Sequence, residues 1–242
     1  MLTAAAFEGN AILASLTGED REQALAGGEI VEFKVRQGVY RPEERINDAY
    51  FPMGAILSVV ARMRDGAMIE VGTIGREGTS AIPLVMGSDT TANECFCQVP
   101  GPAWKMPAEI FRSLLARSRT FREFLNRYLQ AYVNMLGQLA ACNRLHSVYE
   151  RCARWLLMTQ DRVGNDKFPL THEFLAIMLG SRRSGVTVAA AALQKAGFIH
   201  YSHGTITILD RTGLEATSCE CYKVTTEQFG ALLKIQPAKD EA

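Results

Sequence analysis

Two adjacent arginines stand at the start of a predicted helix in the C-terminal third of the chain. Arg182 and Arg183 follow directly after Gly180-Ser181, where one short apolar segment ends and another begins. A guanidinium group presents a planar fork of donors that matches the O6/N7 edge of guanine and the oxygens of a phosphate. Ser184 and Thr187 follow closely, and their hydroxyl groups can bond bases or backbone oxygens. These residue types indicate nucleic-acid recognition.

The elements around the arginines predict how they are presented. Thr171 is a suitable N-cap for a short helix, and Ser181 is a plausible N-cap for a second helix over residues 182–195. Two short strand-like runs follow, with His203-Gly204 between them. Helix, short turn, helix and β-hairpin in this order predict a winged helix-turn-helix, which we place at residues 146–215. The DNA-contacting residues are expected to be Thr171, Ser181, Arg182, Arg183, Ser184, Thr187, Val188 and His203.

The distribution of charge favours the same region. The whole chain has 26 basic and 26 acidic residues, so a protein coated in basic charge is excluded. Between Asn143 and Thr205 there are eight basic and four acidic residues, which gives a local excess of +4 (8 − 4). This is a modest electrostatic footprint for a polyanionic partner. The alternative is a winged helix that contacts protein, with both arginines merely solvated.

The N-terminal half has a different pattern of apolar and polar residues. The first 26 residues look helical, and residues 29–105 contain short runs with period-two alternation separated by turn residues. Asp65-Gly66 lies between two apolar runs and predicts a hairpin with a type I′ turn. The pattern predicts an α+β protein whose N-terminal domain, residues 1–118, is an antiparallel jelly-roll β-barrel. An ordinary antiparallel sheet without a cavity would give the same spacing.

A long helix is expected at residues 119–145. The winged domain follows it, and residues 216–242 form a C-terminal extension. Apolar residues recur along this helix in seven-residue series, which fits helix pairing across a homodimer. The alternative is a helix that lies on its own barrel. The predicted dimer-interface residues are Leu125, Tyr128, Leu129, Tyr132, Met135, Leu136, Leu139 and Cys142.

Barrel, long helix and winged helix in this order resemble the Crp/Fnr family of bacterial transcription regulators, with similarity over roughly residues 10–215. The most specific stretches are Tyr50-Phe51-Pro52-Met53-Gly54, Ile74-Gly75-Arg76-Glu77-Gly78, Asn143-Arg144-Leu145, and Leu170-Thr171 through Leu179-Gly180-Ser181-Arg182-Arg183-Ser184. The resemblance implies a homodimer on a near-palindromic operator of double-stranded DNA, an effector domain, and RNA polymerase as a further partner. It implies that Arg183 reads a base, while Ser184 and Val188 replace two other base readers of the family, so the operator should differ from that of the cyclic-AMP receptor.

The effector site departs from the family pattern. Cyclic-nucleotide binders of this family hold the cyclic phosphate with an arginine, and no arginine occurs between Glu77 and Pro100. We therefore expect no conventional cyclic-nucleotide binding, and the effector stays unidentified; a regulator with an atypical cyclic-nucleotide pocket is the alternative. The N-terminal cysteine cluster of the oxygen-sensing branch is absent, since the first cysteine is Cys95. The histidine-free first 145 residues also exclude a histidine-held haem there.

The six cysteines are expected to be reduced thiols of a cytoplasmic protein. Cys95 and Cys97 would point to one face of a strand, as packed core residues or as a redox or metal pair. Cys142 would pack on the dimer seam or cross-link two subunits. Cys219 and Cys221 lie in the extension, where the sequence shows no partner ligands. We therefore predict no metal site and no cofactor.

Three classes of function follow from these observations. The first is a dimeric, sequence-specific DNA-binding regulator, which the arginines and the winged helix favour. The second is an interaction module whose winged helix never touches DNA. The third is a cupin-type enzyme, which would need clustered histidines in the barrel, where there are none. We therefore expect no enzyme activity. The longest apolar runs are too short to span a bilayer, so no membrane association is expected.

Overall fold

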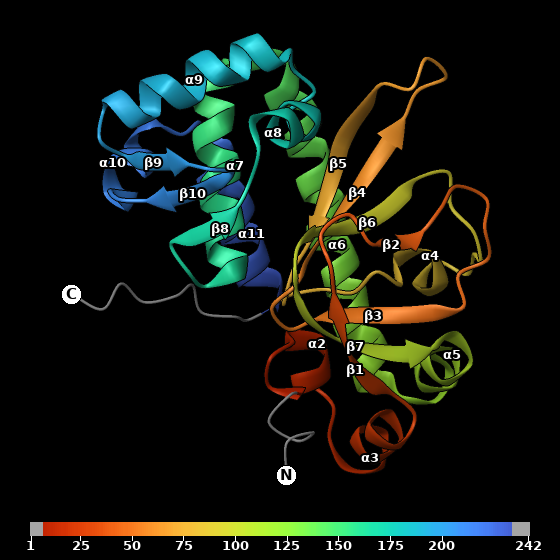
Figure 1. Ribbon diagram of the computed structural model, residues 1–242. Helices are drawn as coiled ribbons and strands as arrows, with labels where there is room; N and C mark the ends of the chain where they lie inside the picture. The colour runs from red at the N-terminus through yellow and green to blue at the C-terminus, as the bar shows by residue number, and fades with distance from the viewer. Residues whose placement is uncertain (1–6, 234–242) are drawn as a thin grey trace. The chain divides into compact units, whose positions relative to one another are not determined.

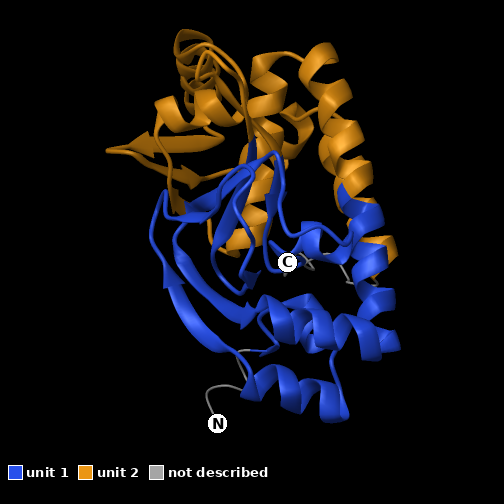
Figure 2. Ribbon diagram, turned by 90° about the vertical axis from the view of Figure 1, so that its right-hand side faces the viewer, with its two compact units in different colours: residues 1–60, 72–132 blue, residues 61–71, 133–242 orange. Residues whose placement is uncertain are grey.

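The computed structural model describes residues 7–233, which form two compact units (Figure 2). Within that range, unit 1 comprises residues up to 60 together with 72–132, and unit 2 comprises 61–71 together with 133–233. The units meet along the chain at 60/61 and 71/72, inside two strands, and at 132/133, inside one long helix. The first six residues of the predicted N-terminal helical segment, and residues 234–242 of the predicted extension, lie outside the described range. None of the described helices combines the length and the apolar composition that a membrane span requires.

Unit 1 is built around two antiparallel sheets (Figure 1). The first has the strand order β1-β7-β3 and the second the order β2-β6-β4-β5. Trp104 and Phe51 face each other across the β3–β7 register and are both buried. The expected α+β class, with an N-terminal antiparallel β-domain, is confirmed. The strands are β1 (Glu29–Phe33), β2 (Gly38–Tyr40), β3 (Asp48–Pro52), β4 (Ile56–Arg62), β5 (Met68–Ile74), β6 (Glu94–Val99) and β7 (Gly101–Pro107).

Helices complete unit 1, and a buried polar side chain fixes the first of them. The Asn10 carboxamide oxygen caps α2 by accepting from the backbone amides of Ile12 and Leu13. Its amide nitrogen donates to the carbonyl oxygens of Pro52 and Gly78, each at 2.9 Å. Asn10 therefore ties the start of α2 to two of the four sequence stretches that carried the family resemblance. The helices are α2 (Ala11–Ala14), α3 (Gly18–Ala26), α4 (Ile82–Val85), α5 (Ala108–Arg117) and α6 (Arg119–Leu145), and α6 continues into unit 2 after residue 132.

The hairpin predicted at Asp65-Gly66 is present between β4 and β5, but its turn is of another type. The loop has three residues, Arg64 to Gly66, and is closed by a hydrogen bond from the Met63 amide to the Ala67 carbonyl. Within this loop only Gly66 has a positive φ, at 87°. The Asp65 carboxylate accepts from the Ala67 amide, which stabilises the longer loop. The prediction of a type I′ turn here is therefore wrong.

The burial along helix α6 bears on the predicted dimer seam, which stays a prediction. Six of its eight residues are buried within their own chain, so they have little surface to offer a partner: Leu125, Tyr128, Tyr132, Met135, Leu139 and Cys142. Only Leu129 and Leu136 keep partial exposure. Packing within the chain accounts for the burial of these six residues. The face of α6 open to solvent carries Val133, which is 57% exposed, together with Gly137, Ala140 and Arg144.

Unit 2 contains the predicted winged helix-turn-helix. Its first helix has a capping box, in which the Ser147 side chain and the Glu150 carboxylate each bond the other residue's backbone amide. The three short strands form one antiparallel sheet in the order β8-β10-β9. The elements are α7 (Val148–Val163), β8 (Lys167–Pro169), α8 (His172–Met178), α9 (Arg183–Lys195), β9 (Ile199–Ser202), β10 (Thr205–Ile208), α10 (Arg211–Thr217) and α11 (Cys221–Leu233).

Candidate nucleic-acid interface

The turn between α8 and α9 is sharp and glycine-dependent. The Thr171 hydroxyl caps α8 by accepting from the Phe174 amide at 3.1 Å. Gly180 after α8 has φ +54°, and a Cβ built on it would lie 2.3 Å from the Ile69 side chain. Only glycine combines the positive φ with this close approach. The helix-turn-helix angle is thus set by packing inside unit 2.

Helix α9 has one buried and one exposed face. Its buried face is the one that the sequence predicted, with Val186, Ala189, Ala190 and Leu193 in the core. The other face is open to solvent over the first two turns and carries Arg183, Ser184, Thr187 and Val188. Val188 is 70% exposed on this face. An exposed face of this composition is suited to contact with another molecule.

The two arginines stand at the beginning of α9 without internal partners. Arg182 occupies the N-cap position, where no side chain caps the helix, and Arg183 is the first helical residue. The predicted N-cap, Ser181, is therefore one residue too early; it is partly exposed. In the described part of the chain neither guanidinium makes a hydrogen bond or an ion pair, and both side chains are exposed. The free amides of an uncapped helix start also favour an anion.

His172 connects α8, α9 and the wing, and the sequence did not indicate it. Its Nδ1 lies 3.3 Å from the hydroxyl of Thr187, which also donates to the Arg183 carbonyl at 2.9 Å. Its ring stacks on Tyr201 of β9 at a centroid distance of 4.2 Å. Burial lowers the pKa of His172, and the positive charge of Arg183 lowers it further. The ring is therefore a neutral spacer at neutral pH, and its contacts lie too far apart in sequence to be predicted.

The wing is a tight hairpin between β9 and β10. Ser202 pairs with Thr205, so the loop consists of His203 and Gly204 alone. Their φ values of 49° and 74° are those of a type I′ turn. His203 is exposed at the tip, and its Nδ1 lies 2.8 Å from the Ser202 hydroxyl. Thr171, the α8 cap, is also exposed near this loop, since its Cγ2 is 3.8 Å from a Cβ built on Gly204.

The local charge excess is smaller at the surface than the sequence count indicates. Of the eight basic residues, Arg151, Arg154 and Arg162 are buried in α7, each no more than 9% exposed. The remaining basic residues, Arg144, Lys167, Arg182, Arg183 and Lys195, are exposed. The arginines of α9 therefore dominate the surface charge of the helix-turn-helix itself.

In unit 1, the two polar side chains that follow Gly78 serve the fold. The Thr79 hydroxyl donates to the Tyr50 carbonyl at 2.9 Å. The Tyr50 amide donates to the Ser80 hydroxyl at 3.0 Å. Both Thr79 and Ser80 are fully buried. These hydroxyl groups are thus held by the backbone of a neighbouring strand.

The cysteines differ in their surroundings: some are packed singly in the core, and others lie close to one another. Cys95 and Cys97 are buried on β6, where burial raises the pKa of both thiols, that of Cys97 to about 12. They are packed core thiols with little thiolate at neutral pH. By contrast, the prediction that Cys219 and Cys221 have no partner ligands is wrong, because they converge with Cys142 and His146. A C-x-C pair and a Cys-x3-His pair on a helix were the available sequence signals.

The comparisons agree with this geometry. Residues 150–217 match the family model described as the Crp-like helix-turn-helix domain. A crystal structure of a Crp/Fnr-family transcriptional regulator from Eubacterium rectale is 20% identical, with a TM-score of 0.66, covering 85% of this chain and 96% of that one. FixK2 from Bradyrhizobium japonicum is 11% identical with a TM-score of 0.68, covering 79% of this chain and 98% of that one. No curated protein matches the sequence.

The fold and the exposed start of α9 define a winged helix-turn-helix protein with an N-terminal β-domain. Residues 150–217 are similar to the Crp-like helix-turn-helix domain, and the chain shares its fold with Crp/Fnr-family regulators of known structure. The resemblance inferred from the sequence is therefore confirmed.

Proposed function

We propose that this chain is a homodimeric, sequence-specific regulator of transcription that acts in the bacterial cytoplasm and binds a near-palindromic operator. The observation that carries the proposal is the pair Arg182 and Arg183, exposed at an uncapped helix start without an internal hydrogen-bond partner. The fold places these two unpaired guanidinium groups together at the start of α9, next to a hairpin wing. Such an arrangement suits the major groove of a duplex.

The exposed residues of α9 have separate roles in this proposal. Arg183 reads guanine through its O6 and N7 atoms, and Arg182 together with the α9 amides holds a phosphate. Val188 contacts a thymine methyl group, because a 70% exposed apolar side chain on this face gains from that contact. Thr171, Ser181, Ser184, Thr187 and His203 contact bases or the backbone from the adjoining turns and the wing.

The effector domain is proposed to respond to something other than a conventionally bound cyclic nucleotide. The stretch after Gly78 has no arginine for a cyclic phosphate, and the hydroxyls of Thr79 and Ser80 are bonded to Tyr50. RNA polymerase is proposed as a partner on the family resemblance.

The experiment is selection of bound fragments from genomic DNA by the full chain, followed by affinity measurements on the selected operator and on random DNA. The Arg183→Ala variant should lose about 1–3 kcal/mol of discrimination between the two. Arg182→Ala should weaken binding to both DNAs about equally and reduce the salt dependence by about one ion.

Lys195→Ala is the matched control, since Lys195 is also exposed on α9 but lies at its opposite end. It should leave discrimination unchanged. If the chain selects no sequence, or if Arg183→Ala discriminates as well as the parent, the proposed base reader is wrong.

A further inference from the structure

Four potential metal ligands converge inside unit 2. They are Cys142, His146, Cys219 and Cys221, and their ligand atoms all lie within 4.8 Å of one another. The sulfur atoms of Cys142 and Cys219 are 3.5 Å apart, and the sulfur of Cys221 is 3.5 Å from Nδ1 of His146. All three thiols are buried and the imidazole is partly exposed. The DNA-binding proposal uses none of these residues.

Local structure brings each pair of ligands to the same point. Cys142 is in the last turn of α6, and His146 follows four residues later on the same side. The His146 amide donates to the Cys142 carbonyl at 3.1 Å, which continues the helical geometry to the histidine. Cys219 lies between α10 and α11, and Cys221 is the first residue of α11. Two rigid helix ends therefore present the four ligands.

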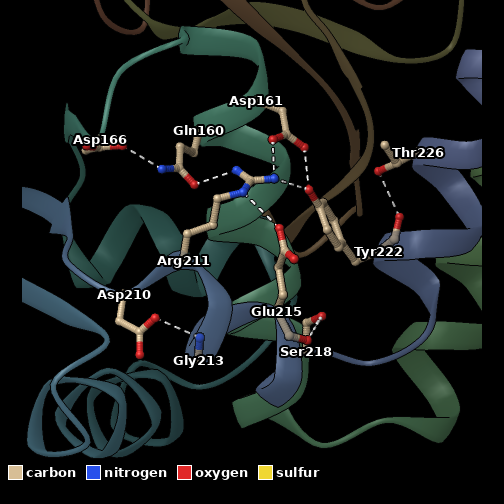
Figure 3. Close-up of polar contacts among 10 residues, drawn as sticks. All are labelled: Gln160, Asp161, Asp166, Asp210, Arg211, Gly213, Glu215, Ser218, Tyr222 and Thr226. Atoms are coloured by element: carbon tan, nitrogen blue, oxygen red, sulfur yellow. Dashed lines mark hydrogen bonds and ion pairs between the residues drawn. The ribbon is translucent and has the colours of Figure 1, made fainter. Parts of the chain in front are cut away.

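The segment that carries the C-x-C pair is itself fixed (Figure 3). Arg211 of α10 forms an ion pair with Asp161 of α7 at 2.9 Å, and it also bonds Gln160 at 2.8 Å. The hydroxyl of Tyr222, the residue after Cys221, donates to the Asp161 carboxylate at 2.9 Å. These contacts anchor both sides of the C-x-C pair to α7, so its position does not depend on the ligands alone.

The ligand separations fit one tetrahedral ion. With metal–sulfur bonds of about 2.3 Å and metal–nitrogen bonds of about 2.0 Å, neighbouring ligand atoms stand roughly 3.5–3.8 Å apart around zinc. The two separations of 3.5 Å are close to this value. A four-iron cluster binds each cysteine through a different iron atom, which would hold the sulfurs further apart. The geometry therefore favours a mononuclear site.

Groups that would orient two of the ligands are also in place. The Nε2 atom of His146 lies 3.1 Å from the Glu220 carboxylate, while its Nδ1 faces Cys221. Carboxylate, histidine and metal in this order are the usual arrangement, because the carboxylate holds the proton on the far nitrogen. The Gln138 amide donates to the sulfur of Cys221 at 3.0 Å, a contact that a thiolate strengthens.

The surrounding charge suits a net negative site. Three thiolates and one divalent cation sum to −1. Arg151 and Arg154 of α7 are only 6% and 4% exposed, and neither forms an ion pair within residues 7–233. Buried guanidinium groups need a compensating anion, which the thiolates would supply.

We propose that Cys142, His146, Cys219 and Cys221 bind one zinc ion that joins the C-terminal end of α6 to the α10–α11 segment. The three thiolates and the imidazole complete a tetrahedron, so no position is open for substrate and the site is structural. The ion would link the end of the long helix to the segment that follows the wing.

The test is the metal content of the full chain, purified under reducing conditions without chelators. We expect about one zinc per chain by mass spectrometry, and Co²⁺ substitution should give the visible bands of a tetrahedral thiolate site. The variants Cys219→Ser and Cys221→Ser should lose the metal to a chelator that the parent resists. Glu220→Gln should weaken binding about ten-fold while keeping the stoichiometry.

Cys152→Ser is the matched control, because Cys152 is a fully buried thiol of α7 outside the four-ligand group. It should retain the zinc. Chelator competition on the parent chain tests the proposal even where a variant fails to fold. The proposal is overturned if the parent chain binds no zinc after incubation with zinc, contains iron and sulfide instead, or gives an octahedral Co²⁺ spectrum. It is also overturned if Cys152→Ser loses the metal as readily as Cys219→Ser and Cys221→Ser do.

Discussion

The indole nitrogen of Trp155 donates a hydrogen bond to the Glu70 carboxylate at 2.9 Å, and both side chains are buried. The two residues are 85 positions apart in sequence. Glu70 lies on β5 in the segment that clusters with unit 2, and Trp155 lies in the middle of α7. Together with the close approach of Ile69 to Gly180, this bond holds residues 61–71 against α7 and the turn between α8 and α9 within unit 2.

Glu70→Ala should lower the free energy of unfolding by about 1–3 kcal/mol, because it leaves a buried indole N–H without this acceptor. Chemical unfolding followed by tryptophan fluorescence measures it, since Trp155 is one of only two tryptophans. Glu32→Ala, at an exposed position of β1, is the control and should change stability by less than about 0.5 kcal/mol. Equal losses in the two variants would argue against the role of the Glu70–Trp155 bond.

Alanine substitutions at Gly180 and Gly185, on either side of the start of α9, should have opposite effects on stability. A Cβ on Gly185 would meet only the Ser181 hydroxyl oxygen, at 3.7 Å, so Gly185→Ala should raise the free energy of unfolding by about 0.5–1 kcal/mol. Gly180→Ala should lower it by at least about 1 kcal/mol, because Gly180 has φ +54° and closely approaches Ile69. Thermal unfolding of both variants gives the comparison. A stabilising Gly180→Ala would show that the turn is not constrained as described.

Much of this fold follows from signals among residues close in sequence. Features that depend on tertiary contacts could not be predicted in this way. The capping of α8 by Thr171 and the buried face of α9 follow from residue types a few positions apart. The three-residue loop at Gly66 depends on how β4 and β5 pair, which the Asp65-Gly66 dipeptide alone does not fix. The faces of α6 could not be assigned, because an apolar series looks the same against its own chain or a partner.

The candidate site shows the same division. Exposure of Arg182, Arg183 and Val188 was predictable from the helix period. The stacking of His172 on Tyr201 and the convergence of Cys142 with Cys219 were not, since the partners are brought together only by tertiary packing. Cysteine and histidine carry no periodicity of their own, so their spacing along the chain does not reveal a shared site.

The pKa of His172 provides a pH-dependent test of its surroundings. Burial and the charge of Arg183 lower this pKa in the folded chain below the ordinary value of about 6.5. The unfolded chain therefore binds the proton more readily, and stability should fall as the pH drops from about 7 through that value. Arg183→Ala should raise the His172 titration midpoint in an NMR titration, with His172→Gln used for assignment. Lys195→Ala should leave the midpoint in place; an identical shift in both variants would contradict the assigned cause.

Val133 provides the test of dimerisation on the open face of α6. Its side chain is 57% exposed, and Gly137 and Ala140 beside it are small enough for a second helix to approach closely. A Cβ on Gly137 would meet no atom within 4 Å, so this surface is open in the chain itself. Val133→Glu should therefore convert a dimer to a folded monomer, because the carboxylate would be buried only in the dimer.

Light scattering coupled to size-exclusion chromatography measures the oligomeric state, and circular dichroism confirms folding. Val35→Glu is the matched control, since Val35 is 48% exposed, follows β1 and is not part of α6, so this variant should leave the dimer intact. Leu125→Glu should instead unfold unit 1, because Leu125 is fully buried in its own chain. A Val133→Glu protein that stays dimeric, or a Leu125→Glu protein that folds as a stable monomer, would favour the interface predicted from the sequence, which includes Leu125. In either result, the solvent-exposed stripe of Val133, Gly137 and Ala140 would not be the dimer contact.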